Sequence, residues 1–133
     1  MVAYYAAFER TVLKKLAATL PEYAGPLLSI ADRLWDQWEI FRQHYQSAAF
    51  HGSNSIKHVL PALVPELSYA GLAVRKGDQA QAHWRAMITS PDADLRAQMA
   101  QELKEYCGLD TYAMVQLHYV LQATVAESWT KST

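Results

Sequence analysis

Cysteine, glycine and proline are scarce in this sequence of 133 residues, with one, five and five copies respectively. The single cysteine, Cys107, excludes an internal disulfide and any zinc-ribbon spacing, so we expect a reducing compartment, the cytoplasm. Because so few glycines and prolines interrupt an alanine-rich chain, helices joined by short loops are favoured. The sequence therefore predicts a mainly α fold.

Charge is also scarce, at 19% of the residues, against about a quarter in typical domains. Twelve basic and thirteen acidic residues give a formal net charge of -1, so no overall positive field gathers phosphates. No run of about 18 apolar residues is present, which argues against a membrane span. A Gly-rich phosphate loop and a Gly-x-Ser-x-Gly elbow are also missing, which leaves P-loop and serine esterase chemistry without support.

The length and the hydrophobic content of 51% suit one core, so we expect residues 1–133 to form a single domain. A short strand near Val2–Tyr5 precedes a helix that begins at Ala6 or Ala7 and stops at Pro21. Helical spacing of apolar residues predicts a second helix over about Pro21–Glu39, and polar turn formers predict a loop over Gln43–Asn54.

The second half of the chain continues the helical pattern. Ser55 is an expected N-cap for a short helix that ends at Pro65. An extended segment over Leu67–Asp78 follows, with a short strand near Leu72–Val74, and Asp78 is expected to cap a helix that runs to about Thr89. The last helical region begins at Ser90 or Asp92 and runs to about Trp129, with one weak point at Gly108. At most one or two short strands are therefore predicted.

One acid lies on the apolar stripe of the last helical region, where residues recur at steps of three or four. Asp110 either pairs with an arginine, caps a new helix after Gly108, or binds a metal. The stripe consists of Leu95, Met99, Leu103, Tyr106, Asp110, Ala113, Leu117 and Leu121.

A second acid, Glu9, shares one face of the first helix with Leu13, Leu16 and Leu20. It is either a partner of the helix dipole in the first turn or a second metal ligand. Two inward acids on separate helices suit Mg²⁺, which takes hard oxygen ligands and few direct carboxylates.

Tyr106 lies one helical turn before Asp110. Its hydroxyl either orients an attacking water in the same pocket or is the hydrogen-bonded tip of a core aromatic.

Three segments resemble motifs of DEDD-type 3′–5′ exonucleases of the tyrosine subclass. YCGLDTYAMVQLHYVL, Tyr106 to Leu121, resembles the third motif, in which Tyr-x3-Asp lies on a helix before an apolar run. YAAFERTVLKKL, Tyr5 to Leu16, resembles the second motif, with Glu9 at the acid position. SIKHVLPALVPELSY, Ser55 to Tyr69, resembles the segment that such domains place between the two.

The order of these segments resembles an uncharacterised bacterial domain family whose C-terminal part is exonuclease-like, over roughly Val2 to Leu121. Two features depart from the pattern. The asparagine of the second motif is Tyr5 here, and the first motif, Asp-x-Glu on a strand, has no counterpart before Glu9. The resemblance implies the helix-rich C-terminal part of an RNase H-like α/β domain, most of whose sheet is absent from this sequence.

The resemblance also implies a set of functional residues and a cofactor. Tyr106, Asp110 and Glu9 would be catalytic, and Glu9 and Asp110 would bind Mg²⁺ or Mn²⁺. Asp36 matches the central Asp motif of the bacterial family; it either approaches the substrate groove or lies on a solvated face. Lys57 and Ser55, at a helix start, either contact a phosphate of nucleic acid or belong to a plain surface helix.

The leading hypothesis is thus a nuclease-like domain that is incomplete and inactive alone. We expect a homo-oligomer or a partner chain to cover the helix faces that the missing sheet leaves bare. The alternative hypothesis is a non-catalytic helical protein-interaction module, in which the same motif residues only pack.

Overall fold

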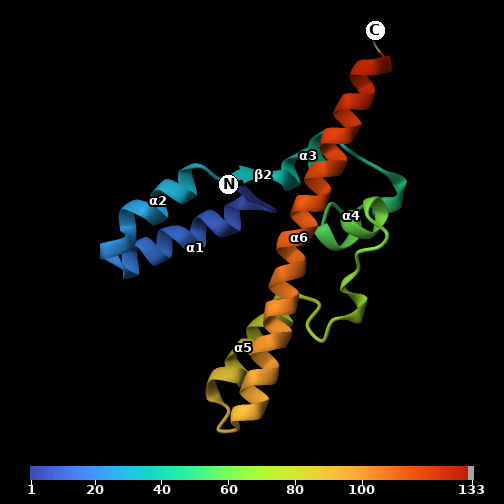
Figure 1. Ribbon diagram of the computed structural model, residues 1–133. Coiled ribbons are helices and arrows are strands. Elements are labelled where there is room, and N and C mark those ends of the chain that lie inside the picture. Colours follow the sequence, from blue (N-terminus) through green and yellow to red (C-terminus); the bar gives the residue numbers. More distant parts are fainter. Residues whose placement is uncertain (132–133) are drawn as a thin grey trace. The chain divides into compact units, whose positions relative to one another are not determined.

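The computed structural model describes residues 1–131 and confirms the mainly α fold (Figure 1). Contacts divide the chain into two compact units, Met1–Ala62 and a second unit that begins at Leu63, whereas the sequence predicts one domain. The elements of the first unit are β1 (Val2–Ala3), α1 (Ala6–Thr19), the 3-10 turn η1 (Pro21–Tyr23), α2 (Ala24–Asp32), β2 (Trp35–Asp36), α3 (Gln37–Gln43), the 3-10 turn η2 (Ala48–Phe50) and α4 (Ile56–Leu63), which crosses into the second unit by one residue. The second unit continues with the 3-10 turn η3 (Tyr69–Gly71), α5 (Gly77–Thr89) and α6 (Ala93–Lys131).

The single helix predicted over Pro21–Glu39 is wrong, because the chain leaves the helical conformation after Asp32. Trp35 and Asp36 are instead extended and pair in parallel with β1, with Val2 opposite Trp35 and Ala3 opposite Asp36. The strand near Val2 is confirmed, but the second strand predicted at Leu72–Val74 is wrong, since the described residues form no strand there.

Helices α1 and α2 pack side by side as an antiparallel hairpin (Figure 1). The buried residues of the two helices are alanines, Ala6 and Ala17 on α1 and Ala31 on α2. Small side chains allow the two backbones to approach closely, and Arg10 crosses the hairpin to donate to the carbonyl of Ala31. Phe8, Val12 and Leu16 of α1 therefore remain exposed.

Aromatic rings form the core of the first unit beyond this hairpin. Phe41 of α3 and Phe50 of η2 are fully buried, and their ring centroids lie 6.2 Å apart. Tyr45 stacks on Phe50, and Tyr4 stacks on Phe41 while its hydroxyl donates to the carbonyl of Asn54. The predicted loop between α3 and α4 is thus anchored by its aromatic residues.

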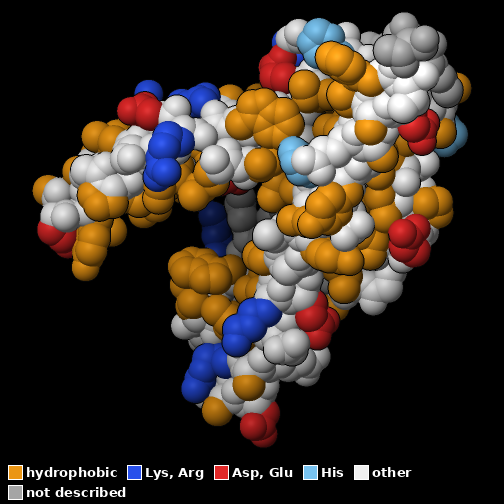
Figure 2. Space-filling model, turned by 45° about the horizontal axis from the view of Figure 1, so that its top comes forward, with side chains coloured by type: hydrophobic (Ala, Val, Ile, Leu, Met, Phe, Trp, Pro, Cys, Tyr) orange, Lys and Arg blue, Asp and Glu red, His pale blue; other side chains and the backbone are white. Residues whose placement is uncertain are grey.

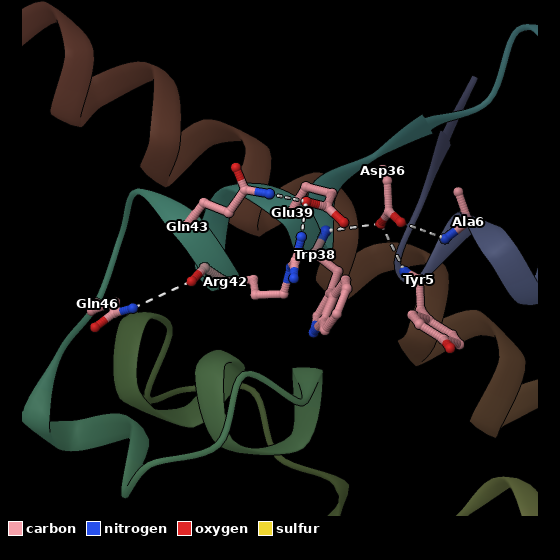
Figure 3. A network of polar contacts seen from close by, with 8 residues as sticks. All are labelled: Tyr5, Ala6, Asp36, Trp38, Glu39, Arg42, Gln43 and Gln46. Carbon is pink, nitrogen blue, oxygen red and sulfur yellow. Dashed lines mark hydrogen bonds and ion pairs between the residues drawn. The ribbon is translucent and has the colours of Figure 1, made fainter.

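The carboxylate of Asp36 joins three backbone segments of the first unit (Figure 3). One oxygen accepts hydrogen bonds from the amides of Tyr5 at 2.9 Å and Trp38 at 3.1 Å, and the other accepts one from the amide of Ala6 at 2.9 Å. Asp36 therefore caps α3 and, from about thirty residues away, also satisfies the first amides of α1, whose own N-cap residue makes no side-chain bond.

In the second unit, α5 packs along the first half of α6 (Figure 1). Helix α5 begins at Gly77, one residue before the predicted cap, so Asp78 lies in its first turn. The predicted start of α6 is confirmed, because Asp92 accepts from the amides of Asp94 and Leu95. The weak point expected at Gly108 is absent from the described chain, where α6 is one continuous helix of 39 residues.

Among residues 1–131, no helix, α6 included, is both long and apolar enough to cross a bilayer.

Replacing Asp36 by alanine should lower the free energy of unfolding of the first unit by about 2 kcal/mol, because two helix caps are lost at about 1 kcal/mol each. Asp36→Asn should be intermediate, since an amide offers only one acceptor oxygen. Urea unfolding followed by tryptophan fluorescence measures both. Asp32→Ala is the matched control, because Asp32 is exposed at the end of α2. Equal stability of Asp36→Ala and Asp32→Ala would contradict the capping role.

Candidate functional site

Tyr106 and Asp110 lie one turn apart on α6, as the stripe predicts. Tyr106 is 8% exposed and Asp110 is half-buried. Further along the same stripe, Ala113 and Leu117 are fully buried, so the stripe faces the protein interior at this level of the helix. Asp110 is therefore an acid that α6 holds beside its buried side.

A second tyrosine, Tyr69 of η3, completes the cluster. Its hydroxyl donates to Oδ1 of Asp110 at 2.6 Å, and its ring centroid lies 6.2 Å from that of Tyr106. Tyr69 is itself buried, and the 3-10 turn that holds it is capped by Ser68, whose hydroxyl accepts from the amide of Ala70. Two tyrosines thus converge on one carboxylate.

These contacts explain the acid on the apolar stripe. The helix does not restart after Gly108, so the prediction that Asp110 caps a new helix is wrong. A buried carboxylate is stabilised by donors, and here tyrosine hydroxyls serve as those donors. Asp110 also has acceptor capacity beyond these two hydroxyls, because a carboxylate has about four lone-pair sites.

Burial raises the pKa of Tyr106 to about 12, and the negative charge of Asp110 and a hydrogen bond to it add to this effect. At neutral pH the phenol is therefore protonated and acts as a donor toward Asp110. It is suited to orient an oxygen ligand or to fix the carboxylate, but it is not a base.

Glu9 lies in the first turn of α1 and is exposed, so the prediction that it points inward is wrong. Its position agrees with the alternative interpretation, an acid near the positive end of the helix dipole. Glu9 and Asp110 belong to different units of the chain. Within residues 1–131, no three His, Cys, Asp or Glu side chains form a group that could hold a metal ion.

The residues predicted to contact nucleic acid are all placed in the first unit. Ser55 caps α4, where its hydroxyl lies 3.4 Å from the amide of Lys57 and its carbonyl accepts from the amides of His58 and Val59. Lys57 is half-buried in the first turn of that helix. Asp36 is a half-buried capping residue, as described above. Contact of Asp36, Ser55 and Lys57 with a nucleic acid stays a prediction.

Tyr69 is the residue that sequence reasoning missed. It is the last residue of the Ser55–Tyr69 segment, so the resemblance included it but gave it no role. Helical periodicity relates Tyr106 to Asp110, whereas Tyr69 reaches the same carboxylate from 41 residues away. The sequence signal that points to Tyr69 has two parts. One is an acid on the apolar side of a helix, which needs hydrogen-bond donors, and the other is a turn that bears a tyrosine.

Comparison with known proteins finds relatives that are much longer than this chain. The model of a family described as a domain of unknown function (DUF2779) matches residues 1–55. An uncharacterised protein of Mycoplasma pneumoniae is 33% identical over 134 residues, which cover 91% of this chain and 20% of that protein. Another, from Mycoplasma genitalium, is 28% identical over 140 residues, which cover 96% of this chain and 21% of that protein. The chain thus spans about a fifth of the length of these curated relatives; no solved structure matches it.

Asp110→Asn should bring the pKa of Tyr106 down from about 12 toward the ordinary value of 10, because it removes a neighbouring negative charge. Absorbance at alkaline pH follows tyrosinate formation, and Tyr106→Phe identifies the component that belongs to this residue. The raised pKa also affects stability. Because Tyr106 holds its proton more tightly in the folded than in the unfolded chain, it stabilises the fold fully below pH 10, and this contribution is lost as the pH rises through about 12.

Asp94→Asn serves as the control, since Asp94 is an exposed acid in the first turn of α6. If the titration curves of Asp110→Asn and the unaltered chain superimpose, Asp110 does not raise the pKa of Tyr106.

Proposed function

We propose that this chain is the helix-rich part of a nuclease-like domain related to two-metal 3′–5′ exonucleases, acting on nucleic acid in the cytoplasm. Asp110 is the carboxylate that this chain gives to the metal site, and Tyr106 is the hydroxyl that orients the attacking water. The observation that supports this assignment most is the pairing of the two residues, one turn apart and hydrogen-bonded, on a continuous helix.

The second unit supplies only part of a metal site. Asp110 offers one hard oxygen ligand of the kind that Mg²⁺ and Mn²⁺ prefer, but a two-metal site needs several carboxylates. When bound, the two metal ions would stabilise the attacking and leaving oxygens of the phosphodiester. Apart from Glu9, which stays a predicted ligand, the further acids, including the Asp-x-Glu of the first motif, would then come from outside this chain.

The length of the relatives supports the proposal that acids from outside this chain complete the metal site. The matched regions are about a fifth of the two Mycoplasma proteins, so a polypeptide of that length has ample room for a sheet that bears the first motif. We propose that this chain acts together with such a region, and that it is inactive without it.

The first unit presents an apolar surface suited to such a partner. We call it the α1 row: Phe8, Val12, Leu16 and Leu20, which are between 36% and 57% exposed and spaced by four residues. Exposed apolar rows of this kind on a stable protein mark contact surfaces. A sheet from the same polypeptide, or a second copy of the chain, would cover it.

The purified chain should therefore self-associate and bind a hydrophobic dye. Leu16→Ser should weaken both, because it removes an apolar side chain from the middle of the α1 row. Sedimentation velocity over a concentration series and dye fluorescence are the measurements. Lys14→Ser, an exposed change on the opposite side of α1, is the control. A monomeric chain that binds no dye would count against this contact surface.

The nuclease proposal predicts that the chain alone does not shorten end-labelled single-stranded DNA or RNA in Mg²⁺ or Mn²⁺. The full-length Mycoplasma pneumoniae relative should do so, as should a chimera in which this chain replaces the matched region. In the chimera, Asp110→Asn should lower the rate at least about a hundredfold, because a metal-ligating charge is lost. Tyr106→Phe should lower it about tenfold or more, because the water is no longer oriented.

Asp94→Asn in the same chimera is the matched control and should leave the rate unchanged. An inactive full-length relative would overturn the proposal, and so would a chimera whose activity survives Asp110→Asn.

One observation favours the second candidate, the non-catalytic interaction module. The carboxylate of Asp110 already has two tyrosine donors, so the cluster is also a stable arrangement without metal. Under this alternative the α1 row is the functional surface and Asp110→Asn changes only stability.

A further inference from the structure

Helix α5 has two different sides. One side packs toward α6, where His83 contacts the carboxylate of Glu102, which also accepts from the amide of Gln98. An adjoining side, which is mostly exposed, has no such partners. We call it the α5 face: Ala80, Gln81, Trp84, Arg85 and Ile88, which follow the i, i+1, i+4, i+5, i+8 spacing of one helix surface.

The α5 face is hollowed and centred on an indole ring. Ala80, Gln81, Trp84 and Arg85 line an open pocket of about 400 Å³. Trp84 is 52% exposed and Ile88 is 53% exposed. A tryptophan that a helix holds half out of the surface offers a flat aromatic ring to a ligand.

The polar groups around this ring are unused. Among the described residues, the amide of Gln81, the indole N–H of Trp84 and the guanidinium of Arg85 make no hydrogen bond or ion pair. Three kinds of donor, and no acid, therefore border the same hollow. Such donors are left available for an anionic or polar ligand.

The one charged side chain of the α5 face is a cation. Arg75 and Lys76 precede the helix, and Arg85 lies on the face itself, whereas Asp78 is the one acid of α5 and sits in its first turn. Figure 2 shows Lys or Arg side chains beside hydrophobic ones, and also Asp or Glu side chains, at the end of the second unit where α5 and the start of α6 lie. The positive charge of the α5 face itself is that of Arg85.

We infer that the α5 face binds single-stranded nucleic acid. An unpaired base stacks on the indole of Trp84, and the adjoining phosphate accepts from the guanidinium of Arg85, while Gln81 donates to the base edge or the sugar. This combination of an aromatic platform with a cation is how proteins hold single strands without reading their sequence. A duplex fits poorly, because its bases are already stacked on one another.

The inference rests on the proposed function, since it states that the nucleic-acid substrate reaches the chain as a single strand.

The inference is tested without catalysis, by the fluorescence anisotropy of labelled oligothymidylate titrated with the 133-residue chain in EDTA at low salt. Trp84→Ala should weaken binding at least about fivefold, as loss of one stacked base does. Arg85→Gln should weaken it and make it less sensitive to salt.

The control variants are Tyr119→Ala, which removes an exposed aromatic residue of α6, and Lys104→Gln, which removes an exposed cation of the same helix. Both should bind like the unaltered chain. Trp84 is exposed, so its replacement by alanine, a strong helix former, should leave the far-UV circular dichroism unchanged.

Several outcomes would overturn the inference: equal binding by Trp84→Ala, competition by duplex DNA as strong as by single strands, or competition by polyglutamate as strong as by oligothymidylate. The last would show that Arg85 binds any polyanion, an acidic protein included. Asp110→Asn should bind normally, so a failure of binding is distinguishable from a failure of the nuclease proposal. Activity in the chimera with no effect of Trp84→Ala on binding would overturn only the inference about the α5 face.

Discussion

The arrangement of the first unit depends on one carboxylate. Asp36 is the last residue of β2, and its two oxygens accept hydrogen bonds from the amides of Tyr5, Ala6 and Trp38. Tyr5 adopts the left-handed conformation, with φ of 70°, to turn the chain from β1 into α1. That conformation costs an ordinary residue about 1 kcal/mol. The bond to Asp36 and the edge-on contact of the Tyr5 ring with Trp38, at 5.2 Å between centroids, offset this cost.

Asp36 and Asp110 are held by different kinds of hydrogen-bond donor. Three backbone amides occupy Asp36, and backbone donors cannot leave without unfolding a helix end. Asp110 is held by two tyrosine hydroxyls, which belong to side chains. Loss of either donor would leave the backbone bonds of α6 intact, whereas loss of the bonds to Asp36 would leave helix-end amides without a partner.

Local sequence patterns predict the elements that local bonds stabilise. The cap of α4 at Ser55 and the cap of α6 at Asp92 follow from nearby side chains and are confirmed. The start of α1 is confirmed too, although its first amides are satisfied by the distant Asp36. Trp35 belongs to a series of apolar residues at helical spacing, but Trp35–Asp36 is extended because it pairs with β1 and because Asp36 bonds to amides about thirty residues away in the sequence. The same limit applies to the candidate site. The spacing of four residues on α6 predicts that Tyr106 and Asp110 lie together, but it does not predict the contact with Tyr69.

The small sheet and the α1 row support the proposed partner for the same physical reason. Two parallel strands of two residues each are too short to be stable alone, and parallel strands are normally covered on both faces. The α1 row leaves apolar side chains exposed beside the helix that follows β1. A sheet that extended β1 and β2 would cover this row as helices cover sheets in α/β domains. The bare strands and the bare apolar row of the first unit therefore call for the same kind of partner.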